Sequence, residues 1–556
     1  MGRISHRDLP ARDARARRIG LGCLLIFMAW SASLLAQSAV PPPHLKKQGT
    51  ATQLIVHGTP FLMLGGELGN SSASDAAYMA TVWPKLRTMH VNTILMPVYW
   101  ELIEPKEHQF DFTLVDNLIA SARTNDLKIV VLWFGSWKNS MSCYAPLWVK
   151  TDQKRFPRAR TQDGKALDIL SPFSDENRNA DAKAFARLMK HLREFDGEQQ
   201  TVGMIQVENE IGMIPQARDY SPEAEEAFGR QVPAPLMTYL QKNKTTLTDE
   251  LQQAWNSAGL KTSGTWEQVF GAGMPTDEIF MAWHFARYTD YIAEAGKKEY
   301  PLPMYVNAAL IRPNYKPGQY PSAGPLPHLM DVWQTAAPHI DFFSPDIYFP
   351  NFAEWLGKFD RCGNAMFIPE VDRRQSIANA FYAMGRHNVM GYCPFSVESV
   401  DDPEHSQFAK GYDILHQLTP LVLEHQGTGT MSGFLLDSAS QSAELTLGDF
   451  IFTVKHEYSW PYATRTDGAP PRFGGLIIMT AHDEFFIAGS GVVVTFRSSS
   501  GNGTMTGIAS MEEGTFVNGQ WVAGRRLNGD EDHQGRHLYL PGAAYGIQKV
   551  KLYTYK

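Results

Sequence analysis

Cysteine is scarce in this sequence, and no spacing of cysteine and histidine suggests a metal site. Only four of the 556 residues are cysteine, at positions 23, 143, 362 and 393. The first lies in an apolar N-terminal stretch, and the other three cannot all pair within one chain. No C-x-x-C pair occurs. The sequence therefore predicts neither a disulfide framework nor a metal site, and we expect no cofactor.

Excess positive charge is also missing. The chain carries 51 Lys and Arg against 58 Asp and Glu, a net charge of −7, and its body has no basic stripe. Nucleic acid is therefore not expected as a partner. The motifs H-E-x-x-H, G-x-S-x-G and the P-loop are absent as well. Zinc proteases, serine hydrolases of that type and P-loop NTPases thus have no support.

The N-terminus has the pattern of an export signal. Several arginines precede the apolar stretch "LGCLLIFMAW", and small residues follow at Ala36 and Ala39. This pattern predicts a secretory signal over residues 1–39 and a periplasmic or secreted protein with no stable membrane insertion after cleavage. An uncleaved membrane anchor is the alternative, although the apolar core is short for a spanning helix.

Eight apolar runs alternate with helix-like segments in the body of the chain. They are continuous rather than alternating in polarity, as expected for parallel strands that are buried on both faces. Their positions are 61–68, 91–100, 128–135, 201–210, 303–310, 340–348, 364–371 and 388–396.

Eight strand–helix units predict an α/β fold, a (β/α)8 TIM barrel over residues 56–420, preceded by a Pro-rich linker at 40–55. The largest insertion lies between the fourth and fifth strands and has helical patterns. An open doubly wound sheet is the alternative, but no Gly-rich loop follows the first strand.

Short β-type runs separated by Gly, Asn and Asp turns fill the last part of the chain. They predict a C-terminal all-β, sandwich-like domain over residues 421–556. Three roles are open for this domain: binding polysaccharide, packing against the barrel, or forming a homodimer.

Three of the predicted strands end in glutamate, namely Glu67, Glu210 and Glu370 on the first, fourth and seventh. Catalytic groups of such barrels lie at the C-terminal ends of the strands. Retaining glycosidases need two carboxylates about 5–5.5 Å apart, one as nucleophile and one as acid/base. Capping or ion pairing is the alternative role for any single one of these acids.

Three blocks carry a family resemblance. "VHGTPFLMLGGEL", "VNTILMPVYWELIEPKEHQFDF" and "IQVENEIG" resemble successive blocks of glycoside hydrolase family 35, the retaining β-galactosidases, and the resemblance spans residues 56–396. It implies that Glu210 is the acid/base and that Glu370, in "FIPE", is the nucleophile. It also implies that Asn209 donates to the 2-hydroxyl group of the sugar.

The sequence departs from the family pattern after the third strand. The loop "WFGSWKNSMSCYAPLW" lacks the family's glutamate–tryptophan pair and offers Lys138 and Asn139 instead. After Glu370, "VDRRQ" lacks the aromatic-rich continuation. The preference for galactose is therefore open.

Two further expectations concern the environments of Glu210 and Glu370, and the remaining predicted substrate contacts lie at or just past strand ends. Apolar neighbours around Glu210 are expected to raise its pKa, so that it holds a proton near neutral pH. Tyr348 is expected to lie against Glu370 and keep it ionised. The other predicted contacts are Glu67, Tyr99, Trp137 and Asn307.

Together these features predict an exported, retaining exo-β-galactosidase that acts on terminal β-galactosyl residues of oligo- or polysaccharides, xyloglucan side chains among them. One alternative is an exo-β-glycosidase for glucosaminyl or arabinosyl termini. A non-catalytic carbohydrate-binding protein on the same barrel is the other alternative.

Overall fold

The computed structural model describes residues 1–2, 40–375, 377–457, 472–500 and 503–556. It separates into two units, residues 1–41 and 42–556, and the description below concerns the second. The predicted secretory signal, 1–39, lies outside the described residues except for the first two positions. None of the helices in the described ranges is both long and apolar enough to cross a membrane.

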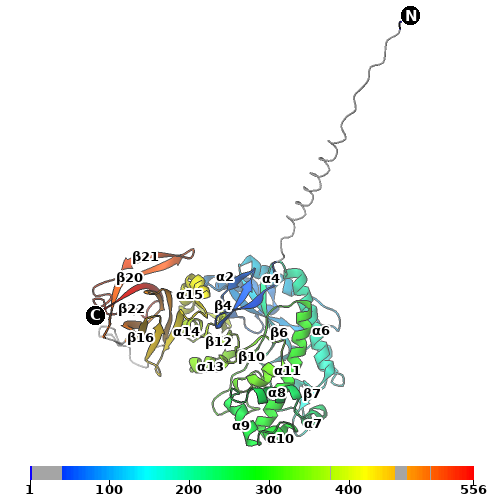
Figure 1. Ribbon diagram of the computed structural model, residues 1–556. Coiled ribbons are helices and arrows are strands. Elements are labelled where there is room, and N and C mark those ends of the chain that lie inside the picture. The colour runs from blue at the N-terminus through cyan, green and yellow to red at the C-terminus, as the bar shows by residue number, and fades with distance from the viewer. Residues whose placement is uncertain (3–39, 376, 458–471, 501–502) are drawn as a thin grey trace. The chain divides into compact units, whose positions relative to one another are not determined.

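Eight parallel strands close into a barrel (Figure 1), in the order β10-β11-β12-β13-β4-β5-β6-β9. Each strand overlaps one of the eight apolar runs, so the barrel prediction is confirmed. The strands are β4 (Met63–Glu67), β5 (Thr93–Tyr99), β6 (Lys128–Lys138), β9 (Val202–Asn209), β10 (Met304–Ala308), β11 (Phe342–Ile347), β12 (Ile368–Asp372) and β13 (Gly391–Phe395).

Helices follow the strands and surround the barrel (Figure 1). Several begin at a side chain that accepts a backbone N–H of the first turn, as Asp75, Ser174 and Ser406 do. Such caps satisfy donors that a helix leaves open. The helices are α2 (Ala76–Thr88), α3 (Trp100–Ile103), α4 (Thr113–Thr124), α6 (Asp175–Asp196), α12 (Met330–Ala336), α13 (Phe352–Phe359), α14 (Ala378–His387) and α15 (Gln407–His425).

The largest insertion lies between β9 and β10, as the sequence predicted. Its longest helix, α11 (Met274–Glu299), packs along α6. The shorter helices are α7 (Pro222–Phe228), α8 (Ala234–Lys242), α9 (Asp249–Ser257) and α10 (Trp266–Phe270). The loop after β6 holds α5 (Leu147–Thr151) and a hairpin of β7 (Arg158–Arg160) and β8 (Ala166–Leu170).

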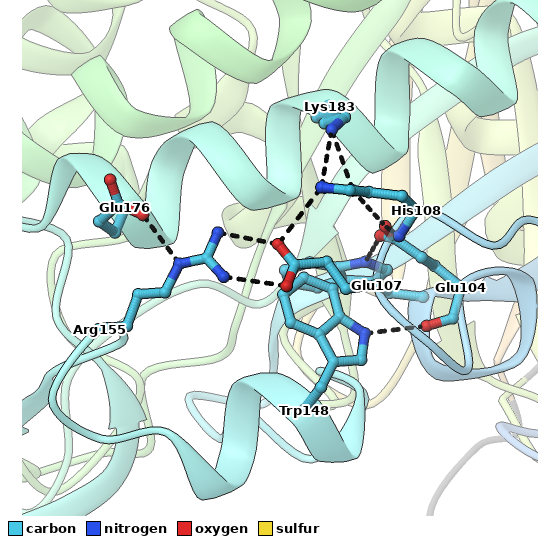
Figure 2. Close-up of polar contacts among 8 residues, drawn as sticks. Glu104, Glu107, His108, Trp148, Arg155, Glu176 and Lys183 are labelled. Atoms are coloured by element: carbon cyan, nitrogen blue, oxygen red, sulfur yellow. Dashed lines mark hydrogen bonds and ion pairs between the residues drawn. The ribbon is translucent and has the colours of Figure 1, made fainter.

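Two loops at the end of the barrel where β5 and β6 finish are tied together by the E-P turn of the second quoted block (Figure 2). The buried side-chain carboxylate of Glu104 accepts the backbone N–H of His108 at 2.8 Å. The backbone carbonyl oxygen of Glu104 accepts the indole N–H of Trp148 at 3.1 Å. Arg155 forms two hydrogen bonds to Glu107, at 2.9 and 2.8 Å. These contacts hold the loop after β6, and this loop starts at Asn139.

The segment predicted as a linker, 40–55, is folded from residue 44 onward. β1 (His44–Gln48), β2 (Ala51–Val56) and β3 (Thr59–Phe61) form an antiparallel sheet. Every residue of β2 is buried, and Leu54 and Val56 belong to the barrel's hydrophobic core, which explains why this run does not remain a linker.

The C-terminal region is all-β and consists of two sheets (Figure 1). One hydrophobic cluster takes residues from both sheets, as in a sandwich. The six-stranded sheet has β14 (Met431–Leu436), β17 (Phe473–Ala481), β18 (Glu484–Gly489), β23 (Gly546–Tyr555), β20 (Met505–Val517) and β21 (Gln520–Arg526). The four-stranded sheet has β15 (Ser442–Leu447), β16 (Phe450–His456), β19 (Val492–Ser498) and β22 (Leu538–Leu540).

The two regions share a packed boundary. The predicted boundary at 420/421 falls inside α15, which ends at His425. α14 packs on β14 and β17, where a Cβ on Gly385 would lie 2.7 Å from the Cα of Gly433. Only glycine permits so close an approach of helix and strand.

Candidate active site

The end of β9 directs neighbouring acidic side chains to opposite sides of the barrel wall. Glu208 and Glu210 have positive φ values of 61° and 44°, a left-handed conformation that is uncommon for residues other than glycine. Such backbone strain persists where the surroundings enforce it and is concentrated at functional sites. Glu210 faces other acids inside the barrel, whereas Glu208 faces α6.

Four carboxyl groups gather at the C-terminal ends of the strands, and we call Glu67, Glu210, Asp346 and Glu370 the inner carboxyl cluster. They come from β4, β11 and β12 and from the position just after β9, and their exposed fractions are 1%, 9%, 1% and 6% in sequence order. Lys138, itself 6% exposed, is the cation that influences several of them. Across the described ranges, no group of His, Cys, Asp and Glu has the arrangement of a metal site.

Burial raises the pKa of Glu210 to about 7, and the negative charge of Glu370 adds to this effect. The cation of Lys138 and a hydrogen bond with Asp346 act in the opposite direction. The Asn139 amide donates to Glu210 Oε2, and the Glu210 backbone N–H donates to Asn307 Oδ1 at 3.0 Å. Near neutral pH this carboxyl is therefore partly protonated.

Glu370 accepts the hydroxyl hydrogen of Tyr348 on Oε1, the contact expected from the sequence. Within the part of the chain that the structure describes, its Oε2 atom is buried and has no hydrogen-bond partner. Burial and the charge of Glu370 raise the pKa of Glu67 well above its usual value. Glu67 is thus suited to hold a proton beside Glu370.

Asp346 belongs to the site although sequence reasoning missed it. The Asn307 amide donates to Asp346 Oδ2 at 2.7 Å, and the same Asn307 holds the backbone of Glu210. Burial and the charges of Glu370 and Glu210 raise the pKa of Asp346 well above its usual value. An acid inside the apolar run "FFSPDI" is the signal that would have found it, because a buried carboxylate is costly unless paired or used.

The loop residues Lys138 and Asn139 contact the acidic strand end directly. Lys138 Nζ donates to Asn209 Oδ1 at 2.7 Å. The other amide atom of Asn209, Nδ2, is buried and has no acceptor among the described residues. The lysine therefore orients this amide and leaves one donor open toward the site.

Tyr99 and Trp137 do not join the cluster, which corrects the sequence-based prediction. The Tyr99 hydroxyl donates to the carbonyl oxygen of Asn70 at 2.7 Å. The Trp137 ring is fully buried and packs edge-on against Phe285 and Tyr288 of α11, at 5.5 and 4.5 Å between centroids. Trp137 thus faces the helix layer and not the inner carboxyl cluster.

A second buried acid pair lies outside the barrel wall, and we call Asp181 and Glu208 the outer carboxyl pair. Glu208 accepts the backbone N–H groups of Trp137 at 2.7 Å and Ser136 at 3.3 Å. Asp181 accepts the Trp133 indole at 2.8 Å and the Ser136 N–H and hydroxyl at 3.0 and 2.5 Å. Burial raises the pKa of both carboxyls. The pair fixes the end of β6 against β9 and α6.

Comparison with known proteins gives one short match and several weak structural ones. A β-galactosidase of Xanthomonas manihotis is 32% identical over 90 residues, which is 16% of this chain and 14% of that protein. The β-galactosidase structures from Bacillus circulans sp. alkalophilus and Rahnella sp. R3 align at TM-scores of 0.44 and 0.46 and 14% and 16% identity. These alignments cover 64% and 67% of this chain and 56% and 58% of those chains. The chain thus spans less than two thirds of each of these relatives.

Two family models match the chain. Residues 408–539 match a domain of unknown function, DUF5597. Residues 74–354 match the β-galactosidase model of glycoside hydrolase family 42, so the findings support a β-galactosidase family but not family 35 in particular. This match covers just over half of the chain, which therefore belongs to the glycoside hydrolase family 42 β-galactosidases.

Proposed function

We propose that the protein is an exported, retaining exo-β-galactosidase in which Glu370 is the nucleophile and Glu210 the acid/base. One observation carries the proposal. Two acids at the ends of β9 and β12 share one buried cluster, with the pKa of Glu210 at about 7 and a hydroxyl donor on Glu370. A retaining glycosidase needs this division of labour between an acid that holds its proton and a carboxylate that attacks.

In the first step, Glu370 Oε2 attacks the anomeric carbon and the bond to the leaving oxygen breaks. Glu210 transfers its proton to that oxygen, so a galactosyl–Glu370 ester forms and the alcohol departs. Tyr348 leaves Oε2 free for this attack because its hydroxyl holds Oε1.

In the second step, the ionised Glu210 removes a proton from water, and the water oxygen attacks the anomeric carbon. The ester bond breaks, galactose leaves with retained configuration, and Glu370 is ionised again. The same two groups are then in their starting states, so the cycle needs no further reactant.

Asn209 and Lys138 serve sugar binding in this proposal. The Nδ2 group of Asn209, buried and unpaired within the described ranges, is the donor for the sugar 2-hydroxyl group. Lys138 fixes the opposite end of that amide at 2.7 Å. A hydrogen bond to the 2-hydroxyl that strengthens in the transition state contributes to the rate.

The substrate that we propose is a terminal β-galactosyl residue of an oligo- or polysaccharide, with xyloglucan side chains as one source. The resemblance to β-galactosidases supports the sugar. The arginine-rich and apolar N-terminal pattern supports export to the periplasm or beyond the cell.

A β-glucosaminide is the second candidate substrate, and the charge of the site favours it. The inner carboxyl cluster has four acids, while Lys138 is the cation that acts on them. An ammonium group on the sugar would relieve the repulsion among these acids. A panel of aryl β-galactoside, β-glucosaminide and β-arabinoside substrates separates these specificities by kcat/KM.

Substitution Glu370→Gln tests the mechanism. We expect turnover of an aryl β-galactoside to fall by at least about 10⁴-fold, because the amide cannot form the ester. Intact-mass analysis of the wild-type enzyme during turnover of a slow, activated galactoside should show the added galactosyl group. Near-wild-type turnover by the variant would exclude Glu370 as nucleophile.

A further inference from the structure

Two tyrosine rings stand exposed at the far end of the C-terminal region. Tyr553 and Tyr555 are 49% and 47% exposed, and their rings lie 5.7 Å apart at an angle of 30°. Single exposed apolar side chains are common, but a contiguous apolar surface that is rimmed by polar groups marks an interaction site. We call Tyr553, Tyr555 and the neighbouring Met505 the tyrosine platform.

The platform lies on a two-stranded ribbon that extends beyond the rest of its sheet. β23 pairs with β20 as far as Tyr555 opposite Met505. On one side, β18 pairs with β23 only up to Lys551. On the other side, pairing of β20 with β21 begins at Glu512. Beyond these points, no other strand among the described residues pairs with either edge of the ribbon.

Gly507 fixes the Tyr553 ring. It lies opposite Tyr553 in the register of β20 and β23, and a Cβ atom there would be 2.5 Å from Cε1 of that ring. The ring thus covers the bare backbone of Gly507, an arrangement in which an aromatic side chain protects a strand glycine. A preorganised ring loses little conformational freedom when it binds a ligand.

A hollow lies on each side of the platform. One, of about 540 Å³, is lined by the tyrosines and by Asn528 and Gln534 from the loop after β21. The other, of about 710 Å³, is lined by the tyrosines and by hydroxyl side chains, among them Ser499 and Thr504. Amides and hydroxyls beside an aromatic face offer both donors and acceptors, which match sugar hydroxyl groups.

Charged groups around the platform have partners within the domain. Asp483 lies 3.5 Å from Lys551. Arg526 donates to the carbonyl oxygen of Ala509 at 3.2 Å, and Asp532 accepts the backbone N–H of Gly535 at 3.0 Å. Acidic and basic side chains are also equally numerous along the two hollows, so an uncharged ligand fits better than an ionic one. They are Asp449, Asp483 and Asp532 against Arg526, Arg536 and Lys556.

We propose that the tyrosine platform binds a neutral, β-1,4-linked polysaccharide chain. A β-linked pyranose chain is extended and presents flat C–H faces, which can stack on the two tyrosine rings while its hydroxyls reach the flanking amides and hydroxyls. The site is separate from the inner carboxyl cluster, which lies at the mouth of the barrel. It would hold the enzyme on the polymer from which it removes terminal sugars.

Affinity electrophoresis of the full-length protein in gels that contain galactosylated xyloglucan tests the proposal. We expect the wild-type protein to be retarded, and the double variant Tyr553→Ala/Tyr555→Ala to bind about tenfold more weakly. Tyr553→Phe keeps the ring and should bind as the wild type does. Tyr78→Ala on α2 is the matched control, because Tyr78 is also exposed, at 47%, but lies outside the platform.

Turnover of a small aryl β-galactoside, measured on the same proteins, separates this inference from the proposed function. If the platform variants turn over the galactoside as fast as the wild type while the double variant is less retarded, polysaccharide binding by the tyrosine platform is supported. This holds even if galactose proves the wrong sugar. The proposal is overturned if wild-type protein is not retarded by xyloglucan, if only polygalacturonate retards it, or if the double variant is retarded as strongly as the wild type.

Discussion

The inner carboxyl cluster and the outer carboxyl pair lie on two sides of the same barrel wall and are equally buried, yet their hydrogen bonding differs. In the outer pair, every oxygen of Asp181 and Glu208 accepts a hydrogen bond from β6. In the inner cluster, Glu67 Oε1, Asp346 Oδ1 and Glu370 Oε2 have no ordinary donor among the described residues.

This difference separates a structural from a functional use of buried acid. Buried polar atoms in proteins are almost always hydrogen-bonded, so several orphaned oxygens in one place need a reason. In the proposed function, substrate binding and shared protons supply that reason inside the barrel. Outside the wall, the backbone of β6 already satisfies the acids, and nothing is left for a ligand.

Substitution Glu210→Gln should give the largest effect that distinguishes the two sets. We expect kcat/KM for a galactoside with a poor leaving group to fall by about 10²–10⁴-fold, because general acid catalysis is lost. With an activated nitrophenol leaving group, the first step should be much less impaired, since that group needs no proton. An equal loss for both leaving groups would contradict the acid role.

Substitution Tyr348→Phe removes the hydroxyl that Glu370 accepts. We expect a fall in kcat of about 10-fold with a small change in KM, because a charge-assisted hydrogen bond to the nucleophile is lost while the ring remains. Tyr239→Phe is the matched control, since that hydroxyl donates to Asp331, outside the inner carboxyl cluster, at 2.8 Å. Equal losses in both variants would point to a general packing effect.

Substitution Lys138→Met should move the pH profile. Glu210 must be protonated to act as an acid, so activity should fall as pH rises through about 7. The Lys138 cation lowers the pKa of Glu210, and its removal should therefore shift this alkaline limb of kcat/KM to higher pH. Lys128→Met, at the opposite end of β6, is the control and should leave the limb in place. A downward shift would contradict the proposed electrostatics.

The sequence predicted those parts of the site that depend on strand ends. Continuous apolar runs located all eight strands, and acids at their ends located Glu67, Glu210 and Glu370. The three blocks that suggested family 35 occupy only residues 56–68, 91–112 and 205–212 of the span 56–396, whereas the family 42 model matches residues 74–354. Short blocks can thus indicate the sugar chemistry of a barrel without fixing its family.

Side-chain direction was not predictable at the end of β6. The pairing of β6 with β9 shifts register between Trp133 and Lys138. Counting alternate residues therefore fails there: the successive side chains of Ser136 and Trp137 both contact Tyr288 of α11, and Lys138 is the next side chain that reaches the site. Asp346 was missed for another reason: the predicted apolar run continues to Tyr348, which was assigned as the site residue at its end, whereas β11 ends at Ile347 directly after Asp346.

The outer carboxyl pair gives the smallest effect on catalysis and the sharpest test of the comparison. Burial raises the folded-state pKa of Glu208 above its unfolded value of about 4.5, so folding is favoured at low pH and the free energy of unfolding falls as pH rises above that value.

The substitution Glu208→Gln supplies an N–H to Asp181 in place of a shared proton. The free energy of unfolding, from urea titrations at several pH values, should then fall less as pH rises than it does in the wild type. Turnover at neutral pH should stay within a few-fold of wild type. A folded Glu208→Gln protein without turnover would place Glu208 in the chemistry and end the distinction between the two sides of the wall.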